Sequence, residues 1–144
     1  MNNAPSLPKY HAILVGINSY PRKPLRGCVR DVRAMHHYLL DNSRKPLHAE
    51  LLIADGNADV EQSSLSQESC LRPTYANVTS VLADVARSAN SGDFVYIHFS
   101  GHGTRATPDS RFSNMSTGDL ALVLLDTDDG HGTKCLWAQD LLYH

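Results

Sequence analysis

The short motif Ser100-Gly101-His102-Gly103 directly follows an apolar run and is the segment of the chain best suited to proton-transfer chemistry. Histidine exchanges protons near neutral pH, and its glycine neighbours permit unusual backbone angles and close approach. His102 could therefore act as a general base toward a nucleophile, with the backbone amide of Gly103 donating a hydrogen bond to an oxyanion. From this local pattern alone, a histidine that only occupies a turn is an equal alternative.

Further polar side chains follow the other apolar runs, at positions where strands are expected to end. These side chains are Asn18 and Ser19, then Cys28 and Asp31, and finally Asp126, Asp128 and Asp129. In open α/β sheets, binding and catalytic sites lie outside the carboxyl ends of the strands. We therefore expect Asp31 and His102 to lie at the same edge of the sheet.

The spacing of apolar residues predicts the elements that must position these groups. Strands are expected at 11–17, 49–54, 94–99 and 120–125, and helices at 27–40, 74–90 (with Thr74 as N-cap) and 136–143. Their alternation favours an α/β fold with a mostly parallel sheet, in which the first and third strands are neighbours and helices cover both faces. The long polar segments 55–73 and 104–118 are expected to be loops.

Composition limits the possible functions. The 144 residues suffice for one domain, which we expect at 9–144 after a disordered tail at 1–8. A net charge of -2 argues against binding to nucleic acid or to an anionic membrane surface. No apolar run approaches the roughly 20 residues of a membrane-spanning helix. Three scattered cysteines and no signal peptide favour a reducing, cytoplasmic location.

Four motifs together resemble the metacaspases, caspase-fold cysteine peptidases, and are most similar to the N-terminal large-subunit part of the fungal type. The motifs are His11–Pro21, Leu25–Val32, Pro73–Val78 and Gly92–Gly103. The resemblance runs from about Lys9 to the end of the chain. It implies a caspase-like three-layer α/β/α sandwich, incomplete at the C-terminus, and an endopeptidase that acts on proteins or peptides.

The resemblance also implies roles for particular residues. His102 matches the catalytic histidine of a Cys-His dyad, and Gly103 matches the oxyanion amide. Cys28, Asp31 and Ser100 match the pocket that holds the Arg or Lys before the cleaved bond, where a carboxylate would pair with the cation. From the residues alone, Asp31 could equally be a first-turn helix carboxylate and Cys28 a small buried side chain.

One part of the family pattern is missing. The family's nucleophile lies on the next strand, in an Asp-x-Cys-His-Ser-Gly motif that this sequence does not contain. Cys28 belongs to the pocket motif, Cys70 lies in a long loop, and Cys135 stands at a predicted helix start. None of them follows a strand at the expected edge, so we expect the chain by itself to be an inactive fragment.

Other functions remain as alternatives. Asp126, Asp128 and Asp129 could bind calcium, which the chemistry of a thiol peptidase does not require, or could form a solvated acidic turn. A caspase-like adaptor or regulatory module without activity is the main alternative function. A metal-dependent hydrolase using His98, His102 and the aspartates is weaker, because the histidine spacing falls on a strand and turn.

Overall fold

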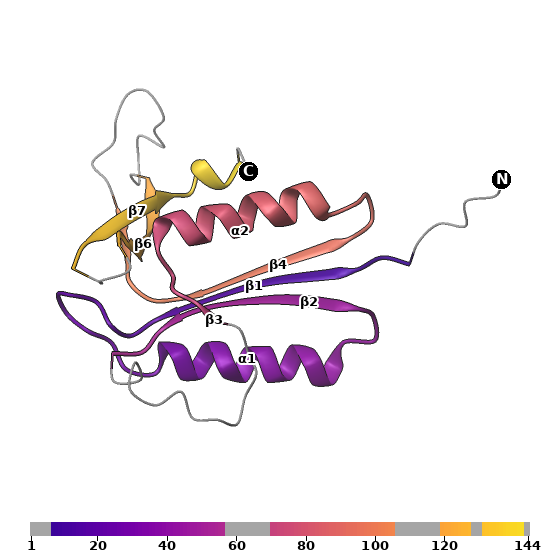
Figure 1. The fold of residues 1–144 in the computed structure, drawn as a ribbon, viewed down its shortest axis with the longest axis horizontal. Helices are drawn as coiled ribbons and strands as arrows, with labels where there is room; N and C mark the ends of the chain where they lie inside the picture. The colour runs from indigo at the N-terminus through magenta and orange to yellow at the C-terminus, as the bar shows by residue number, and fades with distance from the viewer. Residues whose placement is uncertain (1–6, 57–69, 106–118, 128–130, 143–144) are drawn as a thin grey trace.

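The computed structural model describes residues 7–56, 70–105, 119–127 and 131–142. Its main sheet has four parallel strands, β1 (Tyr10–Ile17), β2 (Leu47–Ala54), β3 (Cys70–Leu71) and β4 (Phe94–Ser100), in the order β3-β2-β1-β4. Helix α1 (Cys28–Asn42) covers one face, and α2 (Tyr75–Ser88) covers the other (Figure 1). The predicted α/β class with a parallel sheet between helices is confirmed. Within the segments predicted as a tail and as long loops, residues 1–6, 57–69 and 106–118 lie outside the described residues.

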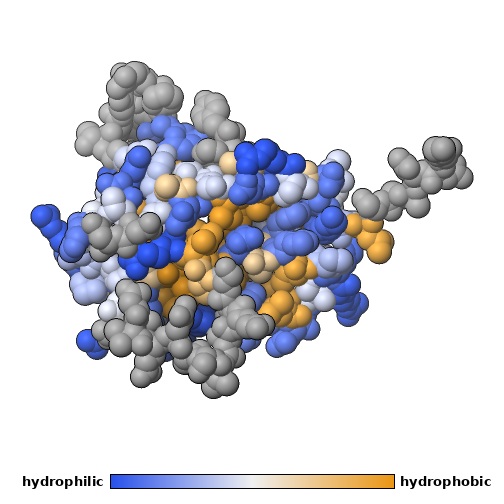
Figure 2. All heavy atoms as spheres, viewed as in Figure 1, coloured by the Kyte–Doolittle hydropathy of each residue, from blue (hydrophilic) through white to orange (hydrophobic). Residues whose placement is uncertain are grey.

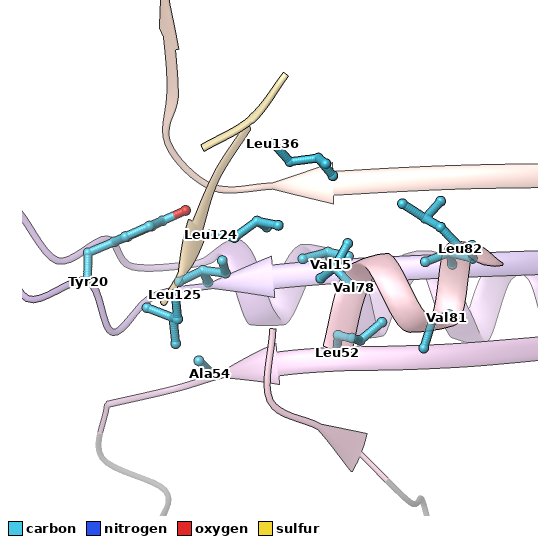
Figure 3. Packing of buried hydrophobic residues seen from close by; sticks show 12 residues of the cluster. Val15, Tyr20, Leu52, Ala54, Val78, Val81, Leu82, Leu124, Leu125 and Leu136 are labelled. Carbon is cyan, nitrogen blue, oxygen red and sulfur yellow. The ribbon is translucent and has the colours of Figure 1, made fainter. Parts of the chain in front are cut away.

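Alternate residues of β1 pack on opposite faces of the sheet and build two cores. Ala12 and Leu14 contact Val32 of α1, whereas Ile13 and Val15 belong to the larger core under α2. All four β1 residues are at most 2% exposed, as expected for a central strand covered on both sides. Figure 3 shows the larger core, in which residues of α2 meet residues of β1, β2 and β6.

A second, antiparallel sheet stands at the carboxyl end of the main sheet (Figure 1). It contains β5 (Gly103–Arg105), β6 (Leu120–Leu125) and β7 (Thr133–Trp137), in the order β5-β6-β7. The strand expected at 120–125 is therefore present but does not extend the parallel sheet. The predicted helix at 136–143 is wrong, because 133–137 pairs with β6 and only Asp140–Leu142 forms a short 3-10 helix. Leu136 faces Leu122 across this pair and is fully buried, so cross-strand packing prevails over the local helical pattern.

The apolar run at 94–99 is typical of a strand that is buried on both faces, and the structure corrects this interpretation. β4 is the outermost strand of the main sheet, and no other described strand pairs with its free edge. Phe94 is 58% exposed and Val95, Tyr96 and Ile97 are 40–48% exposed. A separate area of apolar residues lies at the surface between the two helix layers on the side where β3 lies in front (Figures 1 and 2; Figure 2 shows this face). An apolar sequence alone cannot distinguish a central strand from an uncovered edge strand.

The residues at the N-termini of both helices explain where each helix begins. Thr74 is the N-cap of α2, as predicted, and its hydroxyl accepts a hydrogen bond from the amide of Asn77 at 3.2 Å. The N-cap of α1 is Gly27, whose φ of 103° is accessible to glycine at little cost. Gly16 lets α1 approach β1, since a Cβ there would lie 3.0 Å from the carbonyl oxygen of Cys28. Within the described residues, neither helix has the length and apolar character needed to cross a membrane.

Candidate active site

The topology of the main sheet determines where a site can form. The chain passes from β1 through α1 to β2 on one side, and later through α2 to β4 on the other side of β1. The carboxyl ends of β1 and β4 therefore flank the point at which the strand order reverses, which is the usual ligand position in such sheets. Gly16 of β1 lies opposite Ser100 of β4 in this parallel pair. The predicted neighbour relationship between these two strands is confirmed.

His102 lies in the turn between β4 and β5, and its imidazole is held by the loop that follows β1. Nε2 of His102 lies 2.7 Å from the carbonyl oxygen of Lys23. Because a carbonyl oxygen can only accept, Nε2 carries the proton, and Nδ1 of the neutral ring keeps a lone pair. Lys23 has a φ of 56°, the only positive φ of a non-glycine residue in the described part of the chain. This backbone conformation aims the carbonyl at His102, and Nδ1 is left to act as a base.

Tyr20 supports the same histidine from the other side. Its hydroxyl accepts a hydrogen bond from the His102 amide at 2.9 Å and donates one to the carbonyl oxygen of Val123 at 2.8 Å. The ring centroids of Tyr20 and His102 are 4.5 Å apart. Burial raises the pKa of Tyr20 to about 12; the hydrogen bond from His102 opposes this shift and the nearby Cys28 adds to it. The hydroxyl therefore stays protonated at neutral pH.

Gly103, the first residue of β5, has an amide that faces away from the second sheet. The Val123 amide donates to the His102 carbonyl at 2.9 Å, so Gly103 and Leu122 form the next, non-hydrogen-bonded pair of the antiparallel ladder. The Gly103 N–H consequently points outward from β5, which lies at the sheet edge. Within the described residues this amide has no hydrogen-bond partner, so it can donate to an oxygen beside His102.

A hollow of about 410 Å³ opens over His102 and Gly103. Its lining comes from the loop after β1, the β4–β5 turn and the β6–β7 hairpin: Tyr20, Pro21, Arg22, Lys23, His102, Gly103, Val123, His131, Gly132 and Thr133. It can admit a side chain and the adjoining peptide group of an extended substrate. None of the three cysteines lines this hollow.

The residues predicted to form a basic-side-chain pocket lie at the same end of the sheet. Cys28 is the first residue of α1, and its amide donates to Oδ1 of Asn18 at 3.0 Å. Ser100 is in register with Gly16, and the Cys28 carbonyl lies against Gly16, so both flank that glycine. Asp31 follows on the next turn of α1, with its side chain 56% exposed and 3.5 Å from the guanidinium of Arg30. All three residues thus lie at the same end of the sheet as His102, but none of them is among the residues that line the hollow, and their roles stay predictions.

Only part of the acidic turn at 126–132 lies within the described residues. Asp126 is exposed, and its amide donates to the Gly132 carbonyl at 2.9 Å. Asp128 and Asp129 lie outside the described residues. Among those that are described, no three His, Cys, Asp or Glu side chains gather as metal ligands. His98 contacts the Tyr96 hydroxyl at 3.4 Å, a contact that does not involve His102.

Cys135 and Cys70 have surroundings different from those expected. Cys135 lies in the middle of β7 opposite Val123 and not at the start of a helix. Cys70 begins β3, next to β2. Neither forms a disulfide, and neither occupies the β4–β5 turn at which His102 lies.

Sequence analysis missed two residues that hold His102. Tyr20 receives no role from the sequence, although it belongs to His11–Pro21, the first motif that carries the family resemblance. Lys23 contributes only its carbonyl, which every residue type possesses, so no sequence signal could have identified it. Asn18 was noticed only as a polar residue; it bridges Cys28 to Asp55, whose carboxylate accepts from Asn18 Nδ2 at 3.0 Å.

Comparison with known proteins gives consistent matches. The family model described as "Metacaspase, peptidase C14 domain" matches residues 10–133. Metacaspase-8 of Arabidopsis thaliana is 38% identical over 109 residues, covering 74% of this chain and 26% of the relative. Metacaspase-4 of the same plant is 36% identical over 124 residues, covering 82% and 27%. Metacaspase-1A of Aspergillus oryzae is 36% identical over 99 residues, covering 68% and 21%. The chain thus spans about a quarter of the length of these relatives, which come from plants as well as fungi.

Proposed function

The chain belongs to the metacaspase family of cysteine peptidases, and on that premise we propose that it supplies the histidine half of an endopeptidase site that cleaves after Arg or Lys. The observation that carries the proposal is the 2.7 Å hydrogen bond from His102 Nε2 to the Lys23 carbonyl, which leaves Nδ1 as the base. A hollow large enough for a peptide segment opens over this histidine and the outward amide of Gly103.

The proposed reaction is acyl transfer through a thioester. Nδ1 of His102 takes the proton from a cysteine thiol, and the thiolate attacks the peptide carbonyl carbon. The oxyanion that forms accepts a hydrogen bond from the Gly103 amide. His102 then returns the proton to the leaving amine as the C–N bond breaks. A water molecule, deprotonated by His102, hydrolyses the thioester and regenerates the thiol.

Asp31 is proposed to select the basic side chain before the cleaved bond, with Cys28 and Ser100 as neighbours. A carboxylate beside a cationic side chain forms a charge-assisted pair, which favours basic over neutral side chains. The exposed carboxylate of Asp31, at the same end of the sheet as His102, supports this role. Proteins or peptides with Arg or Lys at that position are the proposed substrates.

We propose that the nucleophile does not come from residues 1–144, so that the chain alone is inactive. In support, none of the three cysteines lines the hollow at His102, and Cys135 is held within β7. The same observation favours the second candidate, a caspase-like module that binds partners without catalysis. A peptidase assay with a fluorogenic peptide that ends in Arg tests whether the chain alone is active. Turnover that iodoacetamide abolishes would contradict the proposal.

A chimera provides the direct test of His102. The matching segment of Metacaspase-8 is replaced by this chain, so that the rest of the relative supplies the remaining parts of the enzyme. We expect hydrolysis of the Arg peptide, its loss in His102→Ala, and its retention in His37→Ala, an exposed histidine of α1 that does not line the hollow. An active chimera carrying His102→Ala would show that His102 is not the base. Asp31→Asn in the same chimera is expected to lower kcat/KM on Arg peptides by orders of magnitude.

Calcium and location are further parts of the proposal. Asp126, with Asp128 and Asp129, is the proposed calcium site, but calcium takes six to eight oxygen ligands and the described residues offer only Asp126 there. No step of the reaction is therefore assigned to the metal, and the chimera is assayed with calcium and with a chelator. Three cysteines that form no disulfide support a reducing, cytoplasmic location.

A further inference from the structure

The Tyr20 hydroxyl occupies the place of a missing rung in the β5–β6 ladder. The Val123 amide donates to the His102 carbonyl, so a regular antiparallel pair would return a bond from the His102 amide to the Val123 carbonyl. Instead, the His102 amide donates to the Tyr20 hydroxyl, and that hydroxyl donates to the Val123 carbonyl. The hydroxyl therefore acts as a spacer that holds His102 away from β6.

The surroundings of Tyr20 are shaped to admit this hydroxyl. Tyr20 is only 4% exposed, and Figure 3 shows it beside β6, past the carboxyl end of β1. A Cβ added at Gly101 would lie 2.4 Å from the hydroxyl oxygen, so glycine is needed there to leave room for it. The raised pKa of Tyr20 keeps the hydroxyl a donor to the Val123 carbonyl at neutral pH.

Tyr20 also restrains the imidazole itself. Its ring lies against the His102 ring at 4.5 Å, with an angle of 48° between the planes. The Lys23 carbonyl, three residues further along the same loop, accepts from Nε2. The imidazole is thus held on one face by Tyr20 and at one nitrogen by Lys23. Its position depends on the backbone of His102, which the Tyr20 hydroxyl fixes.

We propose that Tyr20 is a positioning residue for His102: its hydroxyl spaces His102 from β6, and this spacing sets the hydrogen bond that defines the imidazole tautomer. The inference rests on the proposed function only for its relevance to catalysis, since the geometry of His102 can be measured without any reaction.

The size of the expected displacement follows from hydrogen-bond lengths. Two bonds that meet at a hydroxyl oxygen separate the His102 nitrogen from the Val123 oxygen by about 4 to 5 Å, whereas a direct ladder bond needs about 2.9 Å. Tyr20→Phe removes the spacer and lets the direct bond form, which moves His102 by up to about 2 Å. The 2.7 Å bond to the Lys23 carbonyl does not survive a shift of that size.

The test is the tautomer of His102 in the 144-residue chain, measured by long-range proton–nitrogen NMR correlation with ¹⁵N-labelled histidine. The His102 signals are assigned by their loss in His102→Gln. In the wild type we expect a single tautomer with the proton on Nε2. In Tyr20→Phe we expect a mixture of both tautomers.

The matched control is Tyr96→Phe. Tyr96 also contacts a histidine through its hydroxyl, His98 at 3.4 Å, but on β4 and without contact to His102. We expect this variant to leave the His102 tautomer unchanged. An unchanged tautomer in a folded Tyr20→Phe variant would overturn the proposal.

Two further outcomes keep the test decisive. If Tyr20→Phe does not fold, the wild-type spectrum still decides, because a mixed tautomer there contradicts a positioned imidazole. Failure of the proposed function is a separate result. It would be seen if the chimera that carries His102→Ala remained active, and the tautomer measurement would still be valid.

Discussion

Replacing Gly101 by alanine should destabilise the chain strongly, although its backbone is not in a left-handed conformation. The new Cβ would lie 2.4 Å from the Tyr20 hydroxyl oxygen and 2.8 Å from Cζ of the Phe99 ring. Neither neighbour can move freely, because the hydroxyl makes two hydrogen bonds and Phe99 packs against the core. Overpacking typically costs about 1–3 kcal/mol, and each lost hydrogen bond adds about 0.5–1.5 kcal/mol. We expect a loss of about 3–4 kcal/mol.

Gly103→Ala is the matched control for this prediction. A Cβ at Gly103 would only touch the Ala121 carbonyl oxygen at 3.7 Å, which is ordinary contact. Both substitutions reduce the entropy of the unfolded chain equally, so their difference reports the space around each glycine. With a urea m-value of about 1–3 kcal/mol/M, we expect the Gly101→Ala midpoint to lie about 1–4 M below that of Gly103→Ala. Midpoints that agree within about 0.3 M would refute the argument.

Three other predictions can be checked by urea unfolding. Thr74→Ala removes the cap on the Asn77 amide and should cost about 1 kcal/mol, whereas Thr79→Ala, inside the same helix, should change little; equal effects would contradict the cap. Lys23 has a φ of 56°, which glycine adopts readily and a β-branched residue does not. Lys23→Gly should therefore be as stable as the wild type or more stable by up to about 1 kcal/mol, whereas Lys23→Val should be less stable by at least about 1 kcal/mol. The pKa of Tyr20 rises from 10.0 to about 12 on folding, so the unfolded chain ionises first as the pH rises. The free energy of unfolding should therefore fall by about 1–2 kcal/mol between these pH values, after allowance for solvent screening. The same fall in Tyr20→Phe would show that Tyr20 is not its origin.

The main sheet and the location of the site could be predicted because both depend on local patterns and one topological rule. The run at 11–17 is apolar at nearly every position, as a strand covered on both faces must be. Right-handed crossovers then place α1 and α2 on opposite faces and bring the ends of β1 and β4 together. Those ends carry Gly16 and Ser100, so the motifs at Cys28 and His102 had to meet there.

The second sheet could not be predicted in the same way, because its strands are defined by their partners. Leu136 and Trp137 read locally as the start of a helix, yet they pair with Leu122 and Ala121 of β6. The strand β5 has three exposed residues and no apolar pattern of its own. Its place depends on the hydrogen bond between Val123 and His102, which joins the second sheet to the β4–β5 turn.

The parts of the site that sequence cannot reveal are those built from backbone atoms. Tyr20 and Lys23 reach His102 across 82 and 79 positions of the chain, and three of the four atoms that take part in these contacts belong to the main chain or to the histidine ring. Because Lys23 acts through its carbonyl, side-chain substitutions there preserve the contact as long as the residue tolerates a positive φ. In a substitution scan, the effect at Lys23 would therefore depend on how well each new residue tolerates a positive φ. The effect at Tyr20 would depend on whether the hydroxyl is kept. The two residues support one imidazole, but they would give opposite responses to removal of the side chain.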